Sequence, residues 1–293
     1  PGALTTEPPL NTDSPLSTEL PVPLNIPGLD RQLRMRVHGP ADNYVSRRIR
    51  EEGVWEPYET QLLLQLLSPG DVFVDVGANI GYFSVLAAEV VGPQGRVYAF
   101  EPEPANYALL CANAKLNDVG ARIEAVAGAL SDEDGQGSLF LSGDNFGDHQ
   151  IFGSDEQRPA VSIALYDGGQ FLAERTERLD LLKVDTQGSE YRVMAGLMPL
   201  LGRLDKSSCI LIELTPWSLR QAGSSGRQLI ELLARLALPM WIVDHVEHRV
   251  VASDAEALAT WCDNVDSCEG DQGFMNILVG RLPAGLAADR APT

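Results

Sequence analysis

Glycines and acidic residues that could bind a ligand gather in one short segment, Asp75 to Gly81, which reads Asp-Val-Gly-Ala-Asn-Ile-Gly. Gly77 and Gly81 allow a tight turn and a close approach of the backbone to a ligand. The free N–H groups of a predicted helix follow this turn. Glu101 lies about 20 residues further along the chain, at the end of the next predicted strand, where an acid can bridge two ribose hydroxyls. Together these residues predict a site for a cofactor that contains adenosine.

The spacing of the glycines bears on which adenosine cofactor binds. A dinucleotide site favours Gly-x-Gly-x-x-Gly, so that a pyrophosphate rests on the turn, whereas here Gly77 is followed by a glycine only at position 81. The negative charge of Asp75 opposes a diphosphate and favours a cationic cofactor such as S-adenosylmethionine, which carries an ammonium and a sulfonium group. The pattern favours a methyltransferase. A dinucleotide-dependent oxidoreductase and a non-catalytic adenosine-cofactor-binding protein stay open as alternatives.

Candidate catalytic groups lie at the ends of later strands and in a polar loop. Asp185 ends a predicted strand, and Lys183 precedes it by two positions and therefore points to the same face. Glu213 lies near the end of the following strand. His149 lies in a polar insertion, and an imidazole that titrates near neutral pH suits general-base work. We predict that these four groups orient or deprotonate a methyl acceptor. Their spacing supplies no compact ligand set, so no metal is predicted.

The elements that position these residues alternate between strand and helix. Strand patterns occur at 72–76, 97–100, 122–130, 179–185, 209–214, 239–243 and 274–279, and helical patterns at 57–67, 82–91, 104–117, 188–198 and 225–236. This alternation predicts an α/β fold with a mostly parallel sheet covered by helices on both faces. In such a sheet, ligands bind beyond the carboxyl ends of the strands. The segment between the last two strands shows little helical pattern, so we expect a long hairpin that makes the last strand antiparallel.

Three regions are predicted along the chain. Residues 1–30 are rich in proline, which cannot lie inside helices, and predict an extended arm. Residues 31–69 predict a strand and helices that cover the site. Residues 70–285 predict the catalytic domain, with a polar, glycine-rich insertion at 131–178 that contains short strand patterns at 137–142 and 160–165. The arm is a candidate contact for a homo-oligomer.

The acidic composition excludes partners more than it names them. The 293 residues carry a formal net charge of −19 and an isoelectric point near 4.5, and such a surface repels phosphate backbones and anionic membranes. No run of about 18 uncharged apolar residues predicts a membrane-spanning helix. Four cysteines are too few for a disulfide framework and favour a reducing compartment, so a cytoplasmic location is expected. The expected partner is a small hydroxylated molecule, and neither nucleic acid nor a membrane.

Three motifs together resemble the FkbM-type S-adenosylmethionine-dependent methyltransferases. They are Asp75 to Gly81, Phe100-Glu101-Pro102, and Leu182 to Glu190, which reads Leu-Lys-Val-Asp-Thr-Gln-Gly-Ser-Glu. The resemblance spans about residues 54–280. It implies a class I methyltransferase with a Rossmann-like, seven-stranded sheet whose last strand is antiparallel. It also implies O-methylation of a hydroxyl on a sugar or a secondary metabolite, in natural-product biosynthesis.

The resemblance also assigns residues to the cofactor. It places the glycine turn against S-adenosylmethionine, Glu101 at the ribose, and the end of the third strand at the adenine. The residues so assigned are Asp75, Gly77, Ala78, Asn79, Gly81, Glu101, Pro102, Ser131, Asp132 and Asp185. One position departs from the family pattern Lys-Ile-Asp-x-Glu-Gly-x-Glu, because Gln187 replaces the first of its two glutamates. A base or metal role at that position is therefore in doubt.

Overall fold

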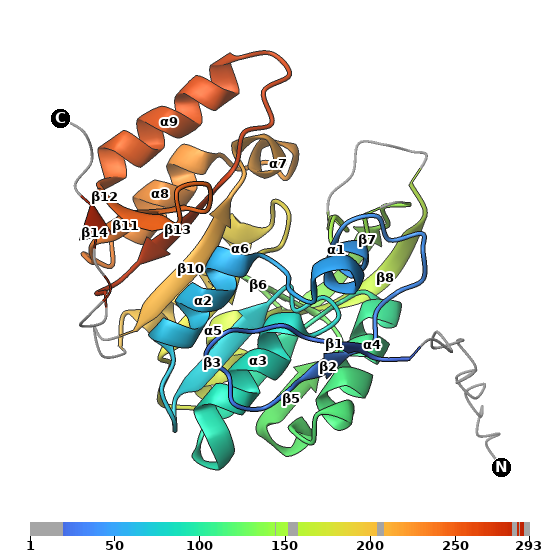
Figure 1. Cartoon of the computed structure of the whole chain (residues 1–293). Helices are drawn as coiled ribbons and strands as arrows, with labels where there is room; N and C mark the ends of the chain where they lie inside the picture. Colours follow the sequence, from blue (N-terminus) through green and yellow to red (C-terminus); the bar gives the residue numbers. More distant parts are fainter. Residues whose placement is uncertain are drawn as a thin grey trace, which may run out of the picture.

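A nine-stranded sheet forms the centre of the protein, shown by a computed structural model that describes residues 20–143, 145–151, 158–203, 208–282, 286 and 288–289. The strand order is β14-β12-β11-β13-β10-β9-β3-β4-β5 (Figure 1). The strands are β3 (Val72–Val76), β4 (Arg96–Phe100), β5 (Ile123–Val126), β9 (Leu181–Val184), β10 (Cys209–Leu214), β11 (Met240–Asp244), β12 (Arg249–Ser253), β13 (Met275–Val279) and β14 (Ala288–Asp289).

The directions of the strands confirm the predicted fold class. Strands β5, β4, β3, β9 and β10 pair in parallel. Strand β13 lies between β10 and β11 and is antiparallel to both. This order, with one reversed strand, is the arrangement of class I methyltransferases. Two further strands, β12 and β14, extend the sheet beyond β11, so the sheet is larger than the seven strands that we predicted.

Helices cover both faces of the sheet because alternate side chains of each strand point to opposite faces. On β3, Phe73 packs with the helices α2 (Pro57–Leu66), α3 (Tyr82–Val91) and α4 (Pro104–Leu116). Val74 packs on the other face, whose helices are α5 (Gly168–Ala173), α6 (Glu190–Leu201), α8 (Gly226–Ala234) and α9 (Ala255–Ser267). Both side chains are fully buried, which explains why this strand reads as a continuous apolar run. A short helix, α7 (Pro216–Gln221), packs beside α8 and α9.

A second, three-stranded sheet corrects the prediction of one strand at 122–130. The chain leaves the main sheet after β5, and β6 (Ala129–Ser131) pairs instead with β8 (Ala160–Asp167), which also pairs with β7 (Gly135–Phe140). Gly128 lies at the break, where a Cβ atom would come within 2.6 Å of the Tyr166 ring. The close packing of Tyr166 at this glycine accompanies the change of sheet. Strands β7 and β8 match the predicted short strands at 137–142 and 160–165.

The segment before β13 contains a helix that the sequence prediction missed. Helix α9 begins after Asp254, whose side chain accepts a hydrogen bond of 2.8 Å from the Ala257 N–H. Leu258, Cys262 and Val265 are buried, and their spacing is that of one helical face. The reversed direction of β13 was predicted correctly, but the connection is a strand and a 13-residue helix rather than a hairpin.

The described part of the N-terminal segment is held against α4. Strands β1 (Val22–Pro23) and β2 (Arg34–Met35) pair with each other, and helix α1 (Val45–Glu52) follows. Asn117, which directly follows α4, accepts from the Arg34 N–H at 2.9 Å and donates to the Arg34 carbonyl at 2.7 Å. Leu24 is buried in the core. Residues 1–19 of the predicted arm lie outside the described residues. Within the described part of the chain, no helix is long and apolar enough to cross a membrane.

Candidate active site

A cavity of about 680 Å³ opens at the carboxyl ends of β3, β4, β9 and β10. Its volume lies in the range of about 300–1,000 Å³ that is usual for small-molecule sites. The start of α2 and the loop 145–151 form further parts of its wall. The sequence prediction placed the site at this edge of the sheet, and nine of its residues line the cavity. They are Gly77, Ala78, Asn79, Glu101, Pro102, His149, Lys183, Asp185 and Glu213.

The glycine turn is tightly packed between β9 and α4. Gly77 has a left-handed φ of +85°, and a Cβ atom there would lie 1.9 Å from the Asp185 carbonyl oxygen. Gly81 also has a φ of +85°, and its Cβ atom would lie 2.5 Å from Leu110. Only glycine can adopt a left-handed φ at little cost and also leave the space that a Cβ atom would occupy. Gly81 therefore packs the turn on α4. It was predicted to contact the cofactor, but it does not line the cavity.

Asp75 lies beneath the turn and does not line the cavity. Its Oδ2 accepts a hydrogen bond of 2.6 Å from Ser84 on α3, while its buried Oδ1 has no hydrogen-bond partner among the described residues. Burial raises the pKa of Asp75, and the charge of Lys183 opposes this rise. The predicted direct contact with the cofactor is therefore corrected to a position behind the turn. The unpartnered Oδ1 leaves this acid able to accept a further hydrogen bond there.

Glu101 has the position and free bonding capacity that a ribose partner needs. Its carboxylate accepts hydrogen bonds from the Asn79 N–H at 2.7 Å and the Glu103 N–H at 2.8 Å. Burial raises its pKa to about 8, against the effect of these two backbone hydrogen bonds. Because a carboxylate offers about four acceptor sites, acceptor capacity remains for a hydroxyl group beyond these two backbone bonds and the interaction with the Asn106 side chain. Together with the glycine turn, this acid fits the adenosine part of S-adenosylmethionine.

The structure places Ser131 and Asp132 away from the cavity. Both follow Leu130, which does line it. The Ser131 carbonyl packs against Gly196 of α6, where a Cβ atom would approach it to 2.1 Å. Asp132 lies 4.0 Å from Arg192 on the same helix. These two residues do not line the cavity because β6 turns them towards α6, and their contacts with adenine stay predictions.

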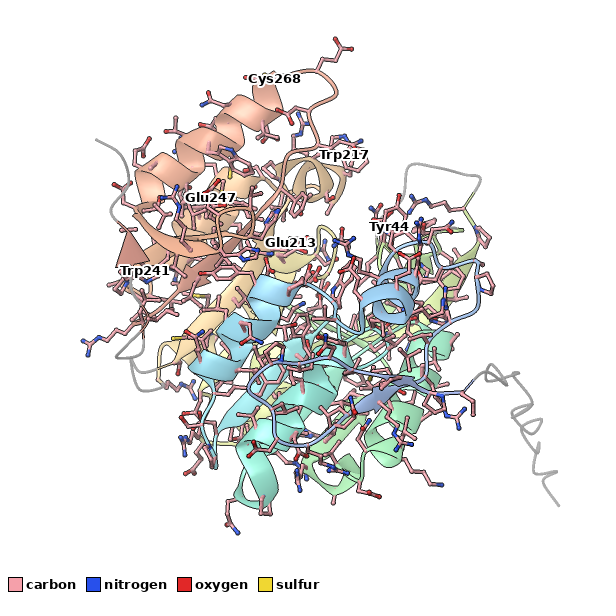
Figure 2. All side chains as sticks on the ribbon, in the orientation of Figure 1. Tyr44, Glu213, Trp217, Trp241, Glu247 and Cys268 are labelled. Carbon is pink, nitrogen blue, oxygen red and sulfur yellow. The ribbon has the colours of Figure 1, made fainter. Side chains whose placement is uncertain are left out.

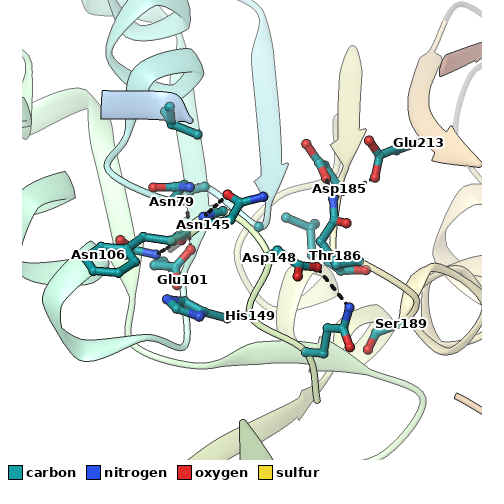
Figure 3. Close-up of a pocket in the computed structure, with 18 of the residues that line it drawn as sticks. Asn79, Glu101, Asn106, Asn145, Asp148, His149, Asp185, Thr186, Ser189 and Glu213 are labelled. Carbon is teal, nitrogen blue, oxygen red and sulfur yellow. Dashed lines mark hydrogen bonds between the residues drawn. The ribbon is translucent and has the colours of Figure 1, made fainter. Parts of the chain in front are cut away.

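His149 lies on the Glu101 side of the cavity rather than beside Asp185 (Figure 3). Its Nδ1 accepts a hydrogen bond of 3.0 Å from the Ser142 N–H. A backbone N–H can only donate, so in the neutral ring the proton resides on Nε2. Burial lowers the pKa of His149 and so favours this neutral form. A role as the base that deprotonates the acceptor is therefore corrected, because Nδ1 is occupied and Nε2 is a donor.

Asp185 and Glu213 lie on the wall opposite Glu101 (Figure 3), and Gln187 joins them by hydrogen bonds. The Gln187 side-chain amide donates to Asp185 Oδ1 at 2.9 Å and to Glu213 Oε2 at 2.7 Å. Lys183 Nζ donates to Asp185 Oδ2 at 2.9 Å and lies 4.9 Å from the centre of the Phe83 ring. The glutamine at the position where the family has glutamate thus links two acids that would otherwise repel each other.

The charges of this group are divided unequally. Burial disfavours the ionised form of Asp185, but Lys183 more than compensates and lowers the pKa of Asp185 below its ordinary value. Burial and the charge of Asp185 raise the pKa of Glu213 well above its ordinary value. Asp185 is therefore the ionised acid at neutral pH, and Glu213 keeps its proton over a wider pH range.

Glu190 explains how this wall is shaped. Its carboxylate accepts hydrogen bonds from the Gly188 N–H at 2.9 Å and the Thr186 N–H at 2.9 Å. These bonds hold the turn between β9 and α6, in which Gln187 takes a left-handed φ of +54°. Glu190 is fully buried and positions its neighbours rather than facing the cavity.

The sequence prediction assigned no site role to several cavity residues. Glu56 and Asn106 are polar, and Asn106 donates to the Phe146 carbonyl at 3.0 Å, which ties the covering loop to α4. Tyr44 and Trp217 come from the start of α1 and from α7 (Figure 2). Phe274 precedes β13. No local pattern marks these residues, because five separate parts of the chain bring them together.

The strand order, the glycine turn and the acid after β4 define a class I S-adenosylmethionine-dependent methyltransferase. Residues 75–237, more than half of the chain, match the methyltransferase FkbM domain. The chain therefore belongs to the FkbM-domain methyltransferases, as the motifs predicted, and the dinucleotide-dependent and non-catalytic alternatives are set aside.

Several known proteins are similar to this chain. The 31-O-demethyl-FK506 methyltransferase FkbM of Streptomyces tacrolimicus is 49% identical over 69 residues, which cover 24% of this chain and 25% of that protein. Methyltransferase sdnD of Sordaria araneosa is 28% identical over 154 residues, covering 42% of this chain and 59% of that protein. The chain thus matches less than two thirds of the length of either. A structure of methyltransferase FkbM from Methylobacillus flagellatus KT has a TM-score of 0.44 at 12% identity, covering 73% of this chain and 44% of that one.

Proposed function

We propose that this methyltransferase transfers a methyl group to a hydroxyl oxygen of an uncharged acceptor, a sugar or a secondary metabolite. The observation that carries this proposal is the wall formed by Asp185 and Glu213, with aromatic side chains beside it. Bound S-adenosylmethionine supplies an activated methyl group on a good leaving group. The residues of the chain then have to bind the acceptor, align its oxygen and move its proton.

The charges of the cavity favour an uncharged acceptor. Asp185 and Glu213 are close to each other, and the one lysine that lines the cavity, Lys183, is already paired with Asp185. The other lining cation, Arg158, is paired with Asp148 at 3.3 Å, so a carboxylate or phosphate on the acceptor would meet no unpaired lysine or arginine among the described lining residues. At an effective dielectric constant of about 20, two like charges about 4 Å apart repel by about 4 kcal/mol. An anionic acceptor is therefore disfavoured, whereas hydroxyl groups can donate to the acids.

Aromatic side chains at the acceptor side favour an acceptor with an apolar face. Trp217 lines the cavity, and Tyr44 and Phe274 line it with 52% and 50% of their surface exposed. The rings of His245 and Phe274 stack with centroids 5.9 Å apart, which extends this surface outward. Sugar rings and cyclic metabolites present such faces. The acidic wall and these rings together suit a molecule that is hydroxylated on one side and apolar on the other.

The name of one relative supports oxygen as the accepting atom. The Streptomyces tacrolimicus protein is a 31-O-demethyl-FK506 methyltransferase, whose name specifies methylation at an oxygen. Its match covers about a quarter of each chain. It supports the proposed reaction type and leaves the acceptor of this chain to be identified.

A panel of acceptors tests the proposal. The protein with S-adenosylmethionine would be offered neutral glycosides and neutral cyclic alcohols, together with matched acceptors that bear a carboxylate or an amine. We expect O-methylated products, identified by mass spectrometry and by NMR of the new methyl group, from neutral acceptors only. Methylation of amines alone, or preference for the carboxylate-bearing acceptors, would refute the proposal.

A further inference from the structure

Glu56 lies in the cavity wall in an unusual backbone conformation. It directly precedes Pro57, the first residue of α2, and has φ 42° and ψ 72°. The left-handed region costs a residue other than glycine roughly 1–2 kcal/mol, and such residues gather at functional sites. The Thr60 N–H donates to the Glu56 carbonyl at 2.8 Å, and the Thr60 hydroxyl donates to the Trp55 carbonyl at 2.7 Å. These bonds hold the conformation in which the side chain of Glu56 lines the cavity.

The carboxylate of Glu56 differs from the other acids of the cavity in its bonding. Glu101 accepts from two backbone amides, and Asp185 and Glu213 share the amide of Gln187. Asp148 accepts from Gln150 at 2.9 Å. Among the residues that the structure describes, none donates a hydrogen bond to the Glu56 side chain. Its oxygens are therefore free to bind a group that enters the cavity.

The groups that act on Glu56 come from four elements. Lys183 and Asp185 lie on and just beyond β9, and the others belong to β10, α2 and α3. The titratable groups are Lys183, Asp185, Glu213, Glu59 and Tyr82. Burial raises the pKa of Glu56 to about 8, and Lys183 opposes that rise. At neutral pH this carboxyl therefore holds a proton, which a nearby positive charge would displace.

We propose that Glu56 is the base that accepts the hydroxyl proton of the methyl acceptor; this inference rests on the proposed function. The proton moves to a carboxylate oxygen of Glu56 as the acceptor oxygen bonds to the methyl carbon. The bond from that carbon to sulfur breaks, and its electron pair stays on sulfur. A carboxylate and a sulfonium thus become a neutral acid and a neutral thioether. Neutralising the carboxylate is favourable because burial disfavours the ionised form of Glu56.

Asp185 differs from Glu56 in its hydrogen bonds and therefore has a different role. Its ion pair with Lys183 and its bond from Gln187 stabilise the ionised form, which makes it a weak proton acceptor. It can still accept a hydrogen bond from a hydroxyl and so orient the acceptor. Glu56 is the better proton acceptor because its carboxylate has no such stabilising donor among the described residues.

Calorimetry with S-adenosylmethionine and S-adenosylhomocysteine tests the inference without any acceptor. The two ligands differ by the sulfonium charge, so a proton displaced from Glu56 should appear with the first ligand only. The titrations are made at pH 7.5 in two buffers of different ionisation enthalpy. Binding of S-adenosylmethionine should release more protons than binding of S-adenosylhomocysteine, and we call this difference, expected to be a fraction of one proton, the extra proton release. Any proton displaced from Glu101 by the shared ribose cancels in this difference.

Glu56→Gln and Glu56→Asn test whether Glu56 is the source of this proton. The second is included because asparagine tolerates the left-handed region. We expect either to abolish the extra proton release and to change the affinity for S-adenosylhomocysteine less than threefold. The matched control is Glu51→Gln on α1, whose side chain is 54% exposed, and it should behave as wild type. Release that survives both variants and vanishes in Glu213→Gln would overturn the inference. So would a tenfold loss of S-adenosylhomocysteine affinity with unchanged turnover.

Kinetics with whichever panel acceptor is methylated complete the test. Glu56→Gln should lower kcat by about 100-fold or more and remove the rise of kcat with pH that a base of raised pKa produces. Unchanged kcat would refute the role of Glu56. If no neutral acceptor is methylated although the extra proton release is present, the proposed acceptor class fails, and calorimetry still identifies Glu56 as the group that carries the proton.

Discussion

Replacing Gln187 by glutamate tests how the acidic wall is held together. The Gln187 amide nitrogen lies 2.9 Å from Asp185 Oδ1 and 2.7 Å from Glu213 Oε2. Gln187→Glu removes both hydrogen bonds, and bonds to charged groups contribute about 1.5–3 kcal/mol each. It also places a carboxylate against ionised Asp185, and at an effective dielectric constant of about 20 two charges about 3 Å apart repel by about 5 kcal/mol.

The new carboxyl group escapes most of that repulsion by keeping a proton, so its folded-state pKa is raised above the unfolded value of about 4.3. An acid with a raised folded-state pKa destabilises the fold increasingly as pH rises from the unfolded pKa towards the folded one. At pH 5 the protonated carboxyl can replace one of the two lost bonds, so we expect Gln187→Glu to lose about 1.5–3 kcal/mol of unfolding free energy there. At pH 8 we expect the loss to be about 2–3 kcal/mol greater.

Urea unfolding at pH 5 and pH 8 measures this difference. Gln187→Met removes the hydrogen bonds without adding charge, so its loss should be nearly equal at the two pH values. Gln221→Glu, on the exposed end of α7, should change stability by less than about 0.5 kcal/mol. If Gln187→Glu is as stable as wild type at pH 8, or loses the same amount at both pH values, the described charge arrangement is incorrect.

Three further predictions concern the cofactor side of the cavity. Glu101→Gln should weaken S-adenosylhomocysteine binding by about 10–100-fold, equivalent to about 1.4–2.7 kcal/mol, and unchanged affinity in titration calorimetry would exclude a ribose contact. Gly77→Ala should lower the unfolding free energy by more than about 2 kcal/mol, since its Cβ would lie 1.9 Å from a carbonyl oxygen. Gly70→Ala, with a φ of +90° but open space around it, should show only the backbone cost of about 1–2 kcal/mol, and equal losses in urea unfolding would contradict the packing argument. His149→Gln should keep turnover within about fivefold between pH 6 and pH 8, because an amide also accepts from one atom and donates from another; loss of turnover as large as in His149→Ala would show that the imidazole itself is needed.

Local patterns were sufficient to predict the elements whose side chains are buried on both faces. Strand β3 and helix α3 have the bounds that were predicted, because an apolar run, a glycine turn and an apolar helix follow one another directly. Strand β10 likewise matches its predicted range. By contrast, β5 and β6 read as one strand, and only the strand pairing in the folded chain shows that the chain changes sheet between them.

The candidate site likewise contains residues that the sequence predicted and residues that only the tertiary structure brings together. The amino-acid sequence alone determined the cofactor turn, Glu101 and the pair Lys183–Asp185, because each depends on residues close together in the chain and on the two-residue period of a strand. The tertiary structure alone decided that Gln187 joins Asp185 to Glu213 and that Glu56, just before α2, lines the same cavity. It also turned Asp132 away and bound His149 Nδ1 to a backbone amide. These outcomes depend on contacts between elements far apart in the chain, and no local period records which residues such contacts bring together.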